Sequence, residues 1–411
     1  MKTSKVSKFY KKSLDERAEF VKDFASLSAD EVNHLKQFGS LGEENADRMI
    51  ENVIGAITLP LGVATNFEIN GNPYMIPMAL EEPSVIAAAS NAAKLSSGFE
   101  TESTDPIMIG QIHLVGVNDS AKAVEEIKSK EKELLRTANS EDSTLINLGG
   151  GAKKIEVNEI GKFIQVHLLV DVRDAMGANA VNTMCEKIAP ELEEISGGKA
   201  RLKIISNLAT ERIAKAKTVW NKEKIGEGTV DLVIEAYEIA KADKYRCTTH
   251  NKGAMNGMDA VVVATGNDWR AFEAGVHSYA SLGSYKPITK YSKDGEGNLI
   301  GEIEIPVQLG IVGGATKINP VAGISLKILG VKSAQELGEV VAAVGLAQNF
   351  AALRALSTEG IQKGHMKLHA KNIAISAGAE GNAADLVAAK MIEEKNIRLV
   401  RAKEIVEEMK K

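Results

Sequence analysis

Two turn-like segments place a lysine and an aspartate sixteen residues apart in this sequence. Lys252 lies within residues 250–257 and Asp268 within residues 264–270, and glycine and asparagine occur in both segments. The apolar run between them, residues 260–263, is typical of a short strand. Residues that flank a rigid element can be held facing a cleft. A cation beside a carboxylate there predicts proton transfer or stabilisation of a negatively charged oxygen.

Two other interpretations of this lysine–aspartate pair stay open. The pair can be a structural ion pair at a turn, or Lys252 can form a Schiff base with a carbonyl substrate. A Schiff base needs a largely uncharged lysine, whereas a nearby aspartate favours the charged ammonium. We therefore prefer ammonium chemistry for Lys252.

An acidic pair, Glu81 and Glu82, precedes Pro83 and Ser84 at the end of an apolar run. Pro83 suits the first turn of a helix, so we expect a helix over residues 84–95. A carboxyl group packed among apolar neighbours has a raised pKa, which suits a general acid. The alternative is a pair of solvated carboxylates that the helix dipole favours.

The sequence Asp-Ala-Met-Gly at residues 174–177 follows an apolar strand and opens a predicted helix over residues 174–195. We expect Asp174 to cap this helix. Gly177 would let an anion such as a pyrophosphate approach the free N–H groups of the first turn. The alternative is a capped helix with a closely packed glycine. Because no Gly-x-Gly-x-x-Gly motif follows a strand at a suitable place, we expect no Rossmann site.

Two histidines, His365 and His369, are four residues apart and would share one face of a helix. Met366 stands where the zinc motif His-Glu-x-x-His has its glutamate, and no third ligand is evident at a helpful spacing. We therefore predict no metal site. Either histidine alone can be structural, and one beside the hinge-like residues 377–381 would suit a mobile acid.

The composition of the 411 residues excludes several classes of protein. Hydrophobic residues make up 44% and charged residues 26%, as in ordinary soluble globular proteins. A net charge of −5 predicts neither a nucleic-acid surface nor an anionic-membrane surface. We expect no membrane span and no secretory signal. Two cysteines, Cys185 and Cys247, suit a reducing compartment, so we expect a cytoplasmic protein.

The order of predicted elements indicates an α+β fold with an inserted domain. Residues 103–208 contain strand, helix, strand, strand, helix and strand in turn, the first of these helices over residues 120–139. This is the split βαβ order of ferredoxin-like domains. Residues 1–102 and 209–361 mix helices and strands and would form one large domain. Within it we expect a hairpin with its turn at Asn70-Gly71 and capping boxes that begin at Ser28 and Ser333. Residues 362–411 would form a helical C-terminal domain.

Six short segments, taken together, resemble those of the 3-hydroxy-3-methylglutaryl-coenzyme A (HMG-CoA) reductases, specifically the soluble class II form of bacteria and archaea. They occur in the order of that family and cover nearly the whole chain, which makes the set specific although each segment alone is weak. The segments are residues 51–55, 81–84, 174–177, 250–253, 266–270 and 364–366.

The resemblance implies reduction of (S)-HMG-CoA to (R)-mevalonate and free coenzyme A, or the reverse, in mevalonate and isoprenoid metabolism. Two hydrides would come from NADH or NADPH, and the path would pass through mevaldyl-CoA and mevaldehyde. Lys252 would stabilise the oxyanion, and Asp268 would hold Lys252 within its proton network. Glu82 would donate a proton, and His365 would protonate the departing thiolate.

The same resemblance implies the binding residues. Arg246 suits the free carboxylate of the hydroxymethylglutaryl group. The substrate would be held by Ser84, Arg246, Asn256 and Gln348. The dinucleotide would lie on the small domain, which is non-Rossmann in this family, against Asp174, Met176, Gly177, Asn179 and Asn207. Residues 362–411 would form a flap that closes over the substrate and carries His365.

The resemblance also implies a homodimer whose subunits share an active site, with residues 51–55 near the interface, and an assembly of dimers such as a hexamer. The choice between NADH and NADPH stays open. No acidic residue lies within residues 136–139, and Arg136 would meet a 2′-phosphate, but Glu141 and Asp142 lie just beyond.

Two alternative functions stay open beside this one. A metal-dependent hydrolase would use His365 and His369. A ferredoxin-like binding module within a scaffold would be no enzyme, and it leaves the segments around Glu82, Lys252 and Asp268 unexplained.

Overall fold

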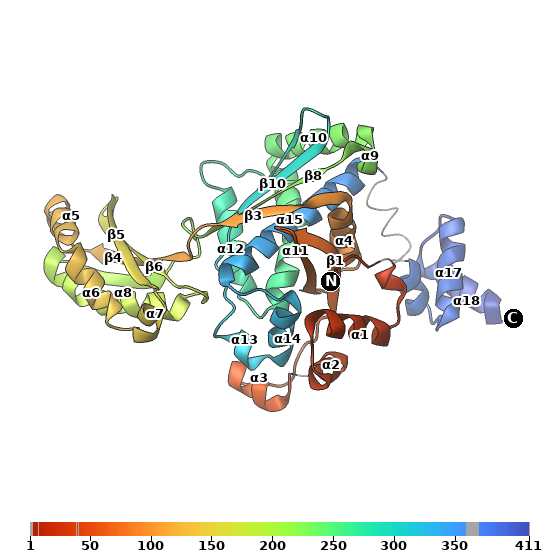
Figure 1. The fold of residues 1–411 in the computed structure, drawn as a ribbon, viewed down its shortest axis with the longest axis horizontal. Coiled ribbons are helices and arrows are strands. Elements are labelled where there is room, and N and C mark those ends of the chain that lie inside the picture. Colours follow the sequence, from red (N-terminus) through yellow and green to blue (C-terminus); the bar gives the residue numbers. More distant parts are fainter. Residues whose placement is uncertain (1–2, 7, 38, 40, 359–369, 411) are drawn as a thin grey trace.

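The computed structural model describes residues 3–6, 8–37, 39, 41–358 and 370–410. These residues form the α+β fold that the sequence predicts, with two separate sheets (Figure 1). Each sheet has a hydrophobic core of its own, and a third, smaller core lies among the C-terminal helices.

The larger unit is built on a six-stranded sheet in the order β2-β1-β3-β8-β10-β9. Three of its helices, α4 (Val85–Leu95), α11 (Lys244–Ala264) and α15 (Ala334–Ser357), pack against one another and against the sheet. Its strands are β1 (Leu61–Ile69), β2 (Asn72–Ala79), β3 (Ser96–Ser103), β8 (Ile213–Trp220), β9 (Thr289–Lys293) and β10 (Leu299–Pro306).

The helix α15 is the centre of this core. Among the described helices, α15 alone is long and apolar enough to cross a membrane. However, 67% of its most apolar 18-residue stretch is buried inside the protein. Its first turn is capped by Ser333, whose hydroxyl accepts the N–H of Glu336. Only this half of the expected capping box forms, because the Glu336 carboxylate accepts the N–H of Lys332 instead (2.6 Å). A buried apolar helix of this kind is what the core of a large domain requires.

The smaller unit is a four-stranded antiparallel sheet in the order β5-β6-β4-β7 (Figure 1). This is the strand order of a split βαβ fold, as the sequence of elements indicates. The helix expected over residues 120–139 is two helices that meet at Lys130. The elements are β4 (Ile107–Val115), α5 (Ser120–Ser129), α6 (Glu131–Asn139), α7 (Ser143–Asn147), β5 (Gly151–Ile160), β6 (Phe163–Asp171), α8 (Ala178–Ser196) and β7 (Lys199–Ile205).

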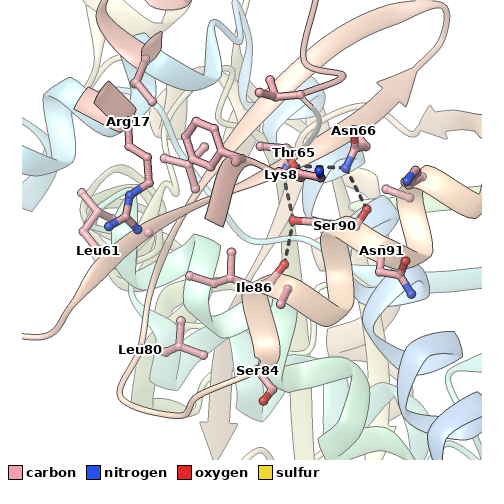
Figure 2. Close-up of a pocket in the computed structure, with 18 of the residues that line it drawn as sticks. Lys8, Arg17, Leu61, Thr65, Asn66, Leu80, Ser84, Ile86, Ser90 and Asn91 are labelled. Carbon is pink, nitrogen blue, oxygen red and sulfur yellow. Dashed lines mark hydrogen bonds between the residues drawn. The ribbon is translucent and has the colours of Figure 1, made fainter. Parts of the chain in front are cut away.

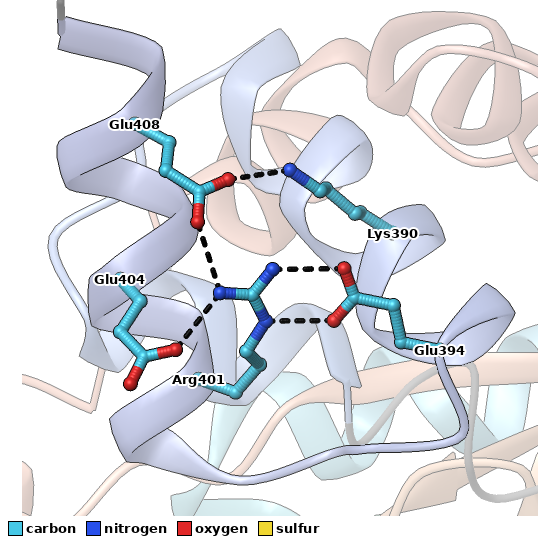
Figure 3. Close-up of polar contacts among 5 residues, drawn as sticks. All are labelled: Lys390, Glu394, Arg401, Glu404 and Glu408. Carbon is cyan, nitrogen blue, oxygen red and sulfur yellow. Dashed lines mark hydrogen bonds and ion pairs between the residues drawn. The ribbon is translucent and has the colours of Figure 1, made fainter.

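The remaining elements lie around the larger unit or follow it. The capping box that the sequence predicts at Ser28 is present, with Glu31 as its second member. The elements are η1 (Phe9–Lys11), α1 (Leu14–Ala25), α2 (Ala29–Lys36), α3 (Glu43–Met49), α9 (Lys222–Ile225), α10 (Glu227–Ala242), α12 (Trp269–Ala280), α13 (Ala315–Ile318) and α14 (Pro320–Leu329). At the C-terminal end, α17 (Asn382–Glu393) and α18 (Leu399–Lys410) pack together, and ion pairs around Arg401 join them (Figure 3).

Candidate active site

Lys252 projects from the middle of a helix, not from a turn. The 21-residue helix α11 begins after Asp243, whose side chain accepts the N–H of Tyr245. The strand expected at residues 260–263 was a wrong prediction, because these residues are the last turn of α11. Ala260, Val261 and Val262 are buried in the core. A short apolar run gives the same periodicity signal in a buried helix as in a buried strand.

Lys252 and Asn256 lie on one face of α11, and together with Glu82, which comes from the connection between β2 and α4, they form a cluster. Lys252 Nζ lies 3.3 Å from Glu82 Oε2. Asn256 Nδ2 lies 3.5 Å from the same oxygen, so Glu82 contacts two side chains that are four residues apart on the helix. The side chains of Lys252 and Glu82 are 59% and 38% exposed. The cluster therefore offers an ammonium, a carboxyl group and an amide to a molecule outside the chain.

Glu82 and Ser84 are positioned by the connection between β2 and α4. Ser84 is the N-cap residue of α4 with a left-handed backbone (φ 75°), and its hydroxyl does not cap the helix. A left-handed conformation is uncommon for a residue with a side chain and often marks a functional site. The Ser84 hydroxyl is therefore left available to a ligand.

A cavity of about 1380 Å³ lies beside this connection. Its wall includes Glu82 and Ser84 together with parts of α1, β1 and α4 (Figure 2). One side is braced by Ser90, whose Oγ donates to the carbonyl of Ile86 (2.7 Å) and accepts the N–H of Thr65 (3.0 Å). A cleft of this size can hold a large ligand next to the exposed cluster.

Two side chains that the sequence analysis did not single out, His250 and Asn251, fix α11 directly before Lys252. His250 Nε2 lies 2.6 Å from Thr289 Oγ1 on β9, and both groups are buried. Asn251 donates to the carbonyl of Lys286 (3.0 Å) and accepts the N–H of Ile288 (3.0 Å). Buried hydrogen bonds of this kind hold a helix in one position, so the backbone of Lys252 is fixed. In the sequence, these two residues appear only as polar neighbours of the lysine within the family-like segment 250–253.

The environment of His250 keeps its ring neutral. Burial, with a contribution from the nearby Arg246, lowers the pKa of His250 to about 3. Arg246 itself is half-buried, and burial lowers its pKa from the usual value. It lies six residues before Lys252, about 120° away around the helix at 100° per residue. The structure thus places Arg246 on the lysine's helix but not on its face.

Within the single chain, Asp268 forms no contact with Lys252 among the described residues. Asp268 caps α12 by accepting the N–H groups of Arg270 (3.0 Å) and Ala271 (3.1 Å). Its other oxygen lies 3.1 Å from Arg270 Nη2. Because Lys252 is in mid-helix, about 18 Å of helix axis separates it from Ala264 at the end of α11.

Asp259 is a further acidic group on the lysine's face of α11, about two turns beyond Lys252. Burial and the neighbouring Glu273 raise the pKa of Asp259 to about 8. Its Oδ1 is buried and has no hydrogen-bond partner among the described residues. This carboxyl group therefore binds a proton more readily than an exposed aspartate does.

Gln348 is buried on α15 opposite Gly257 of α11. A Cβ atom at Gly257 would lie 2.9 Å from Gln348 Cβ, so the glycine allows the two helices to approach closely. Gln348 Oε1 is buried and has no hydrogen-bond partner among the described residues. Gln348 thus packs against Gly257, which follows Asn256 of the cluster on α11. It forms no contact with Glu82 among the described residues.

The segment 174–177 lies at the junction of the two units. The prediction that Asp174 caps α8 was wrong. Its Oδ1 instead accepts the N–H of Ala334 in α15 at 2.8 Å. The N-cap residue is Gly177 (φ 98°), where a Cβ atom would lie 2.5 Å from Val172. The close-packed glycine is therefore real, and α8 begins without a side-chain cap. Met176 lies in this segment, Asn179 is exposed in the first turn of α8, and Asn207 is exposed beyond β7.

The predicted histidine site lies outside the described residues, because His365 and His369 fall within 359–369. In the part of the chain that the structure describes, no group of three His, Cys, Asp or Glu side chains is arranged to hold a metal ion.

Comparison with known proteins identifies relatives over almost the whole chain. Residues 13–370 match the family model described as hydroxymethylglutaryl-coenzyme A reductase. The chain is 56% identical to the 3-hydroxy-3-methylglutaryl-coenzyme A reductase of Archaeoglobus fulgidus, over 99% of this chain and 95% of that protein. It is 36% identical to a probable 3-hydroxy-3-methylglutaryl-coenzyme A reductase of Borreliella burgdorferi, over 89% of this chain and 85% of that protein.

Solved structures show the same fold. The class II 3-hydroxy-3-methylglutaryl-CoA reductase from Streptococcus pneumoniae, bound to NADPH in open conformations, is similar with a TM-score of 0.82 and 39% identity, over 97% of this chain and 100% of that chain. A second structure from Streptococcus pneumoniae gives a TM-score of 0.83 over 98% of this chain and 99% of that chain.

The α+β fold and its matches define an oxidoreductase. More particularly, the chain belongs to the hydroxymethylglutaryl-coenzyme A reductase family.

Proposed function

We propose that the chain reduces (S)-HMG-CoA to (R)-mevalonate and coenzyme A with two equivalents of NADH or NADPH, or catalyses the reverse, in mevalonate and isoprenoid metabolism. The observation that carries this proposal is the Lys252–Glu82 contact of 3.3 Å on an exposed face in a chain of this family. The NADPH bound to the Streptococcus pneumoniae protein supports a reduced nicotinamide as hydride donor.

Lys252 acts on the oxygen that becomes negatively charged. When the thioester carbon receives hydride, its carbonyl oxygen becomes an alkoxide, and the ammonium of Lys252 stabilises that charge. The carbon–sulfur bond of mevaldyl-CoA then breaks to give mevaldehyde, and His365 protonates the thiolate. The aldehyde carbon receives the second hydride, and Glu82 supplies a proton to its oxygen. The sum consumes two hydrides and two protons for each HMG-CoA.

The substrate and the dinucleotide approach Lys252 from different segments. Asn256 belongs to the cluster and Ser84 lies on the same connection as Glu82. We assign these two residues to the hydroxymethylglutaryl group, together with Arg246 on α11 and Gln348 on α15. The cavity beside Ser84 has room for the coenzyme A part of the substrate. Uncapped N–H groups at the start of α8 favour a phosphate. We therefore assign the dinucleotide to Asp174, Met176, Gly177, Asn179 and Asn207.

A homodimer completes the site, and an assembly of dimers such as a hexamer is consistent with it. Apolar side chains before β1 stand in solvent in the single chain: Ile54 and Ile57 are 105% and 96% exposed. Exposed apolar side chains in a contiguous segment mark an interaction surface. Within one chain Asp268 is too far from Lys252, so Asp268 of the partner subunit is the carboxylate we assign to the lysine.

The division of the chain supports these roles. The separate cores fit a large substrate-binding and dimerisation domain at residues 1–102 and 209–361 and a small nucleotide-binding domain at residues 103–208. The core among the C-terminal helices fits a flap at residues 362–411. We place the activity in the cytoplasm, since Cys185 and Cys247 are both free.

The stoichiometry of the reaction tests this function. Purified protein is mixed with HMG-CoA and either NADH or NADPH, and the loss of reduced nicotinamide is measured together with the release of free thiol. We expect two nicotinamides oxidised for each thiol released. No HMG-CoA-dependent oxidation with either nicotinamide would contradict the proposal, and comparing the two rates decides the preferred cofactor.

A further inference from the structure

A buried arginine that takes no part in the proposed chemistry lies at the junction of the two units. Arg212 directly precedes β8 and is only 2% exposed. Its guanidinium donates to two backbone carbonyls, from Nη1 to Ala175 (3.0 Å) and from Nη2 to Leu309 (2.6 Å). Burial lowers the pKa of Arg212 to about 10, which still leaves it charged at neutral pH. Burying a charge is costly to a fold unless the charge is paired and hydrogen-bonded, so the partners of this guanidinium need an explanation.

The two carbonyls belong to the two segments that form the junction. Ala175 lies in the turn at residues 174–177, which precedes α8, and Leu309 lies in the loop after β10. The same loop contacts the turn directly, because the N–H of Ile311 donates to the carbonyl of Asp174 at 2.9 Å. Arg212 therefore links the two segments, because its Nη1 donates to the turn and its Nη2 donates to the loop.

Gly310 brings these two segments into backbone contact. A Cβ atom at Gly310 would lie 2.6 Å from the backbone nitrogen of Met176, so only glycine allows this approach. The N–H of Gly310 donates to Asn267 Oδ1 at 2.8 Å. Asn267 immediately precedes Asp268. A continuous path of short contacts thus runs from the Asp268 segment through Gly310 to Met176 and ends at Arg212.

We propose that Arg212 is a positioning residue for hydride transfer: it fixes the turn at residues 174–177 to the large unit, at a set distance from the Asp268 segment. The inference rests on the proposed function, in which this turn binds the dinucleotide. The turn follows a strand of the small unit, and the N–H of Ala175 donates to the carbonyl of Val172 (3.1 Å). The Asp174 carboxylate, the Ala175 carbonyl and the Met176 backbone, however, contact the large unit. These contacts would fix the position of the bound nicotinamide relative to the catalytic face.

The test replaces Arg212 with lysine, which keeps the charge but cannot donate to two separated carbonyls in a fork. We expect the KM for the preferred reduced nicotinamide to rise about tenfold, the cost of one buried charge-assisted hydrogen bond. The KM for HMG-CoA should change less than about twofold on the same reasoning. The dissociation constant of the dinucleotide, measured by fluorescence titration without HMG-CoA, should rise with the KM.

Two further variants keep the test decisive. Gly310→Ala attacks the same contact from the other side and should raise the same KM. Lys215→Met, which changes an exposed side chain on β8, should leave all three constants unchanged. If Arg212→Lys and Gly310→Ala lower only the melting temperature, or raise both KM values equally, the inference is overturned. If the unaltered protein binds neither NADH nor NADPH, the proposed function fails instead.

Discussion

The helix that carries Lys252 and the helices at the C-terminal end are held in opposite ways. Around Lys252, buried and uncharged groups fix α11: His250 contacts Thr289 and Asn251 binds the backbone of residues 286–288. In α17 and α18 the polar contacts are exposed and ionic. Arg401 forms two bonds with Glu394 (2.7 and 2.8 Å) and one each with Glu404 (2.8 Å) and Glu408 (3.0 Å) (Figure 3).

This difference separates a fixed element of the candidate site from a C-terminal unit that has a core of its own. Directional hydrogen bonds in a buried region specify one geometry, and leaving either partner unpaired is costly. Exposed ion pairs specify little and weaken with salt. The helices α17 and α18 pack mainly on each other around a small core of their own. We infer that the backbone of Lys252 keeps one position whether or not substrate is bound, whereas the C-terminal unit can close over the substrate as one rigid body.

The largest expected effect comes from removing the fixed ammonium. Lys252→Ala should lower kcat about 100- to 1000-fold, the usual cost of losing one group that stabilises an oxyanion. Because Lys252 is exposed, the melting temperature should stay the same. Steady-state rates and thermal unfolding measure the two quantities. Near-normal turnover would remove Lys252 from the role assigned to it.

Replacing His365, the proposed proton donor to the thiolate, should have a smaller and more selective effect on the rates. His365→Gln should slow reduction of HMG-CoA about 100-fold, as for the loss of a general acid. Reduction of added mevaldehyde releases no thiolate and should slow much less. Separate assays with the two substrates give the comparison. Equal impairment of both reactions would refute the leaving-group role.

The buried contact of His250 predicts a dependence of stability on pH. Its pKa is lowered from the ordinary 6.5 to about 3, so the unfolded chain binds this proton more readily than the folded chain does. The stabilisation is therefore complete above pH 6.5 and is lost as pH falls from 6.5 towards 3. One such group costs about 1.4 kcal/mol for each pH unit over that range.

The variants for this prediction are His250→Gln and Tyr291→Phe. His250→Gln should make the free energy of unfolding, measured in urea between pH 6.5 and 4, fall less steeply than in the unaltered protein. Tyr291→Phe removes the hydroxyl that contacts Asn349 (2.9 Å) but no group that titrates in this range. It should lower stability by about 1 kcal/mol at every pH. Identical slopes for all three proteins would contradict a buried neutral His250.

The smallest effect is expected at the C-terminal ion pairs. Arg401→Gln should lower the melting temperature slightly at low salt and hardly at all at high salt, because exposed ion pairs are screened. Thermal unfolding at two salt concentrations measures this. A large loss that persists in high salt would show that these helices are held as firmly as α11, and the comparison would fail.

Local signals in the sequence predicted much of the fold correctly. The Asn70-Gly71 turn joins β1 to β2 with Ile69 opposite Asn72, because both turn residues adopt positive φ (48° and 75°). The capping box at Ser28 and the cap at Ser333 depend on residues three apart, which a sequence displays directly. The order of strands and helices in the small unit was likewise predicted from the sequence, and its four strands form one sheet.

Contacts between distant residues account for what the sequence did not show. Glu82 and Lys252 meet across 170 positions, and nothing local identifies Glu82 rather than Asp268 as the partner in the chain. Asp174 has the sequence of a helix cap but binds Ala334, because a second helix terminus offers its N–H there. Arg212 lies in an unremarkable segment, and only the tertiary fold buries it.

A structure of the dimer with HMG-CoA and the oxidised nicotinamide bound would test the role of Lys252 most directly. We predict that Lys252 Nζ lies about 3 Å from the thioester oxygen, within hydrogen-bond distance, with Glu82 of the same chain beside it. A thioester oxygen that contacts other donors, with Lys252 turned away from it, would contradict the oxyanion-stabilising role of this lysine.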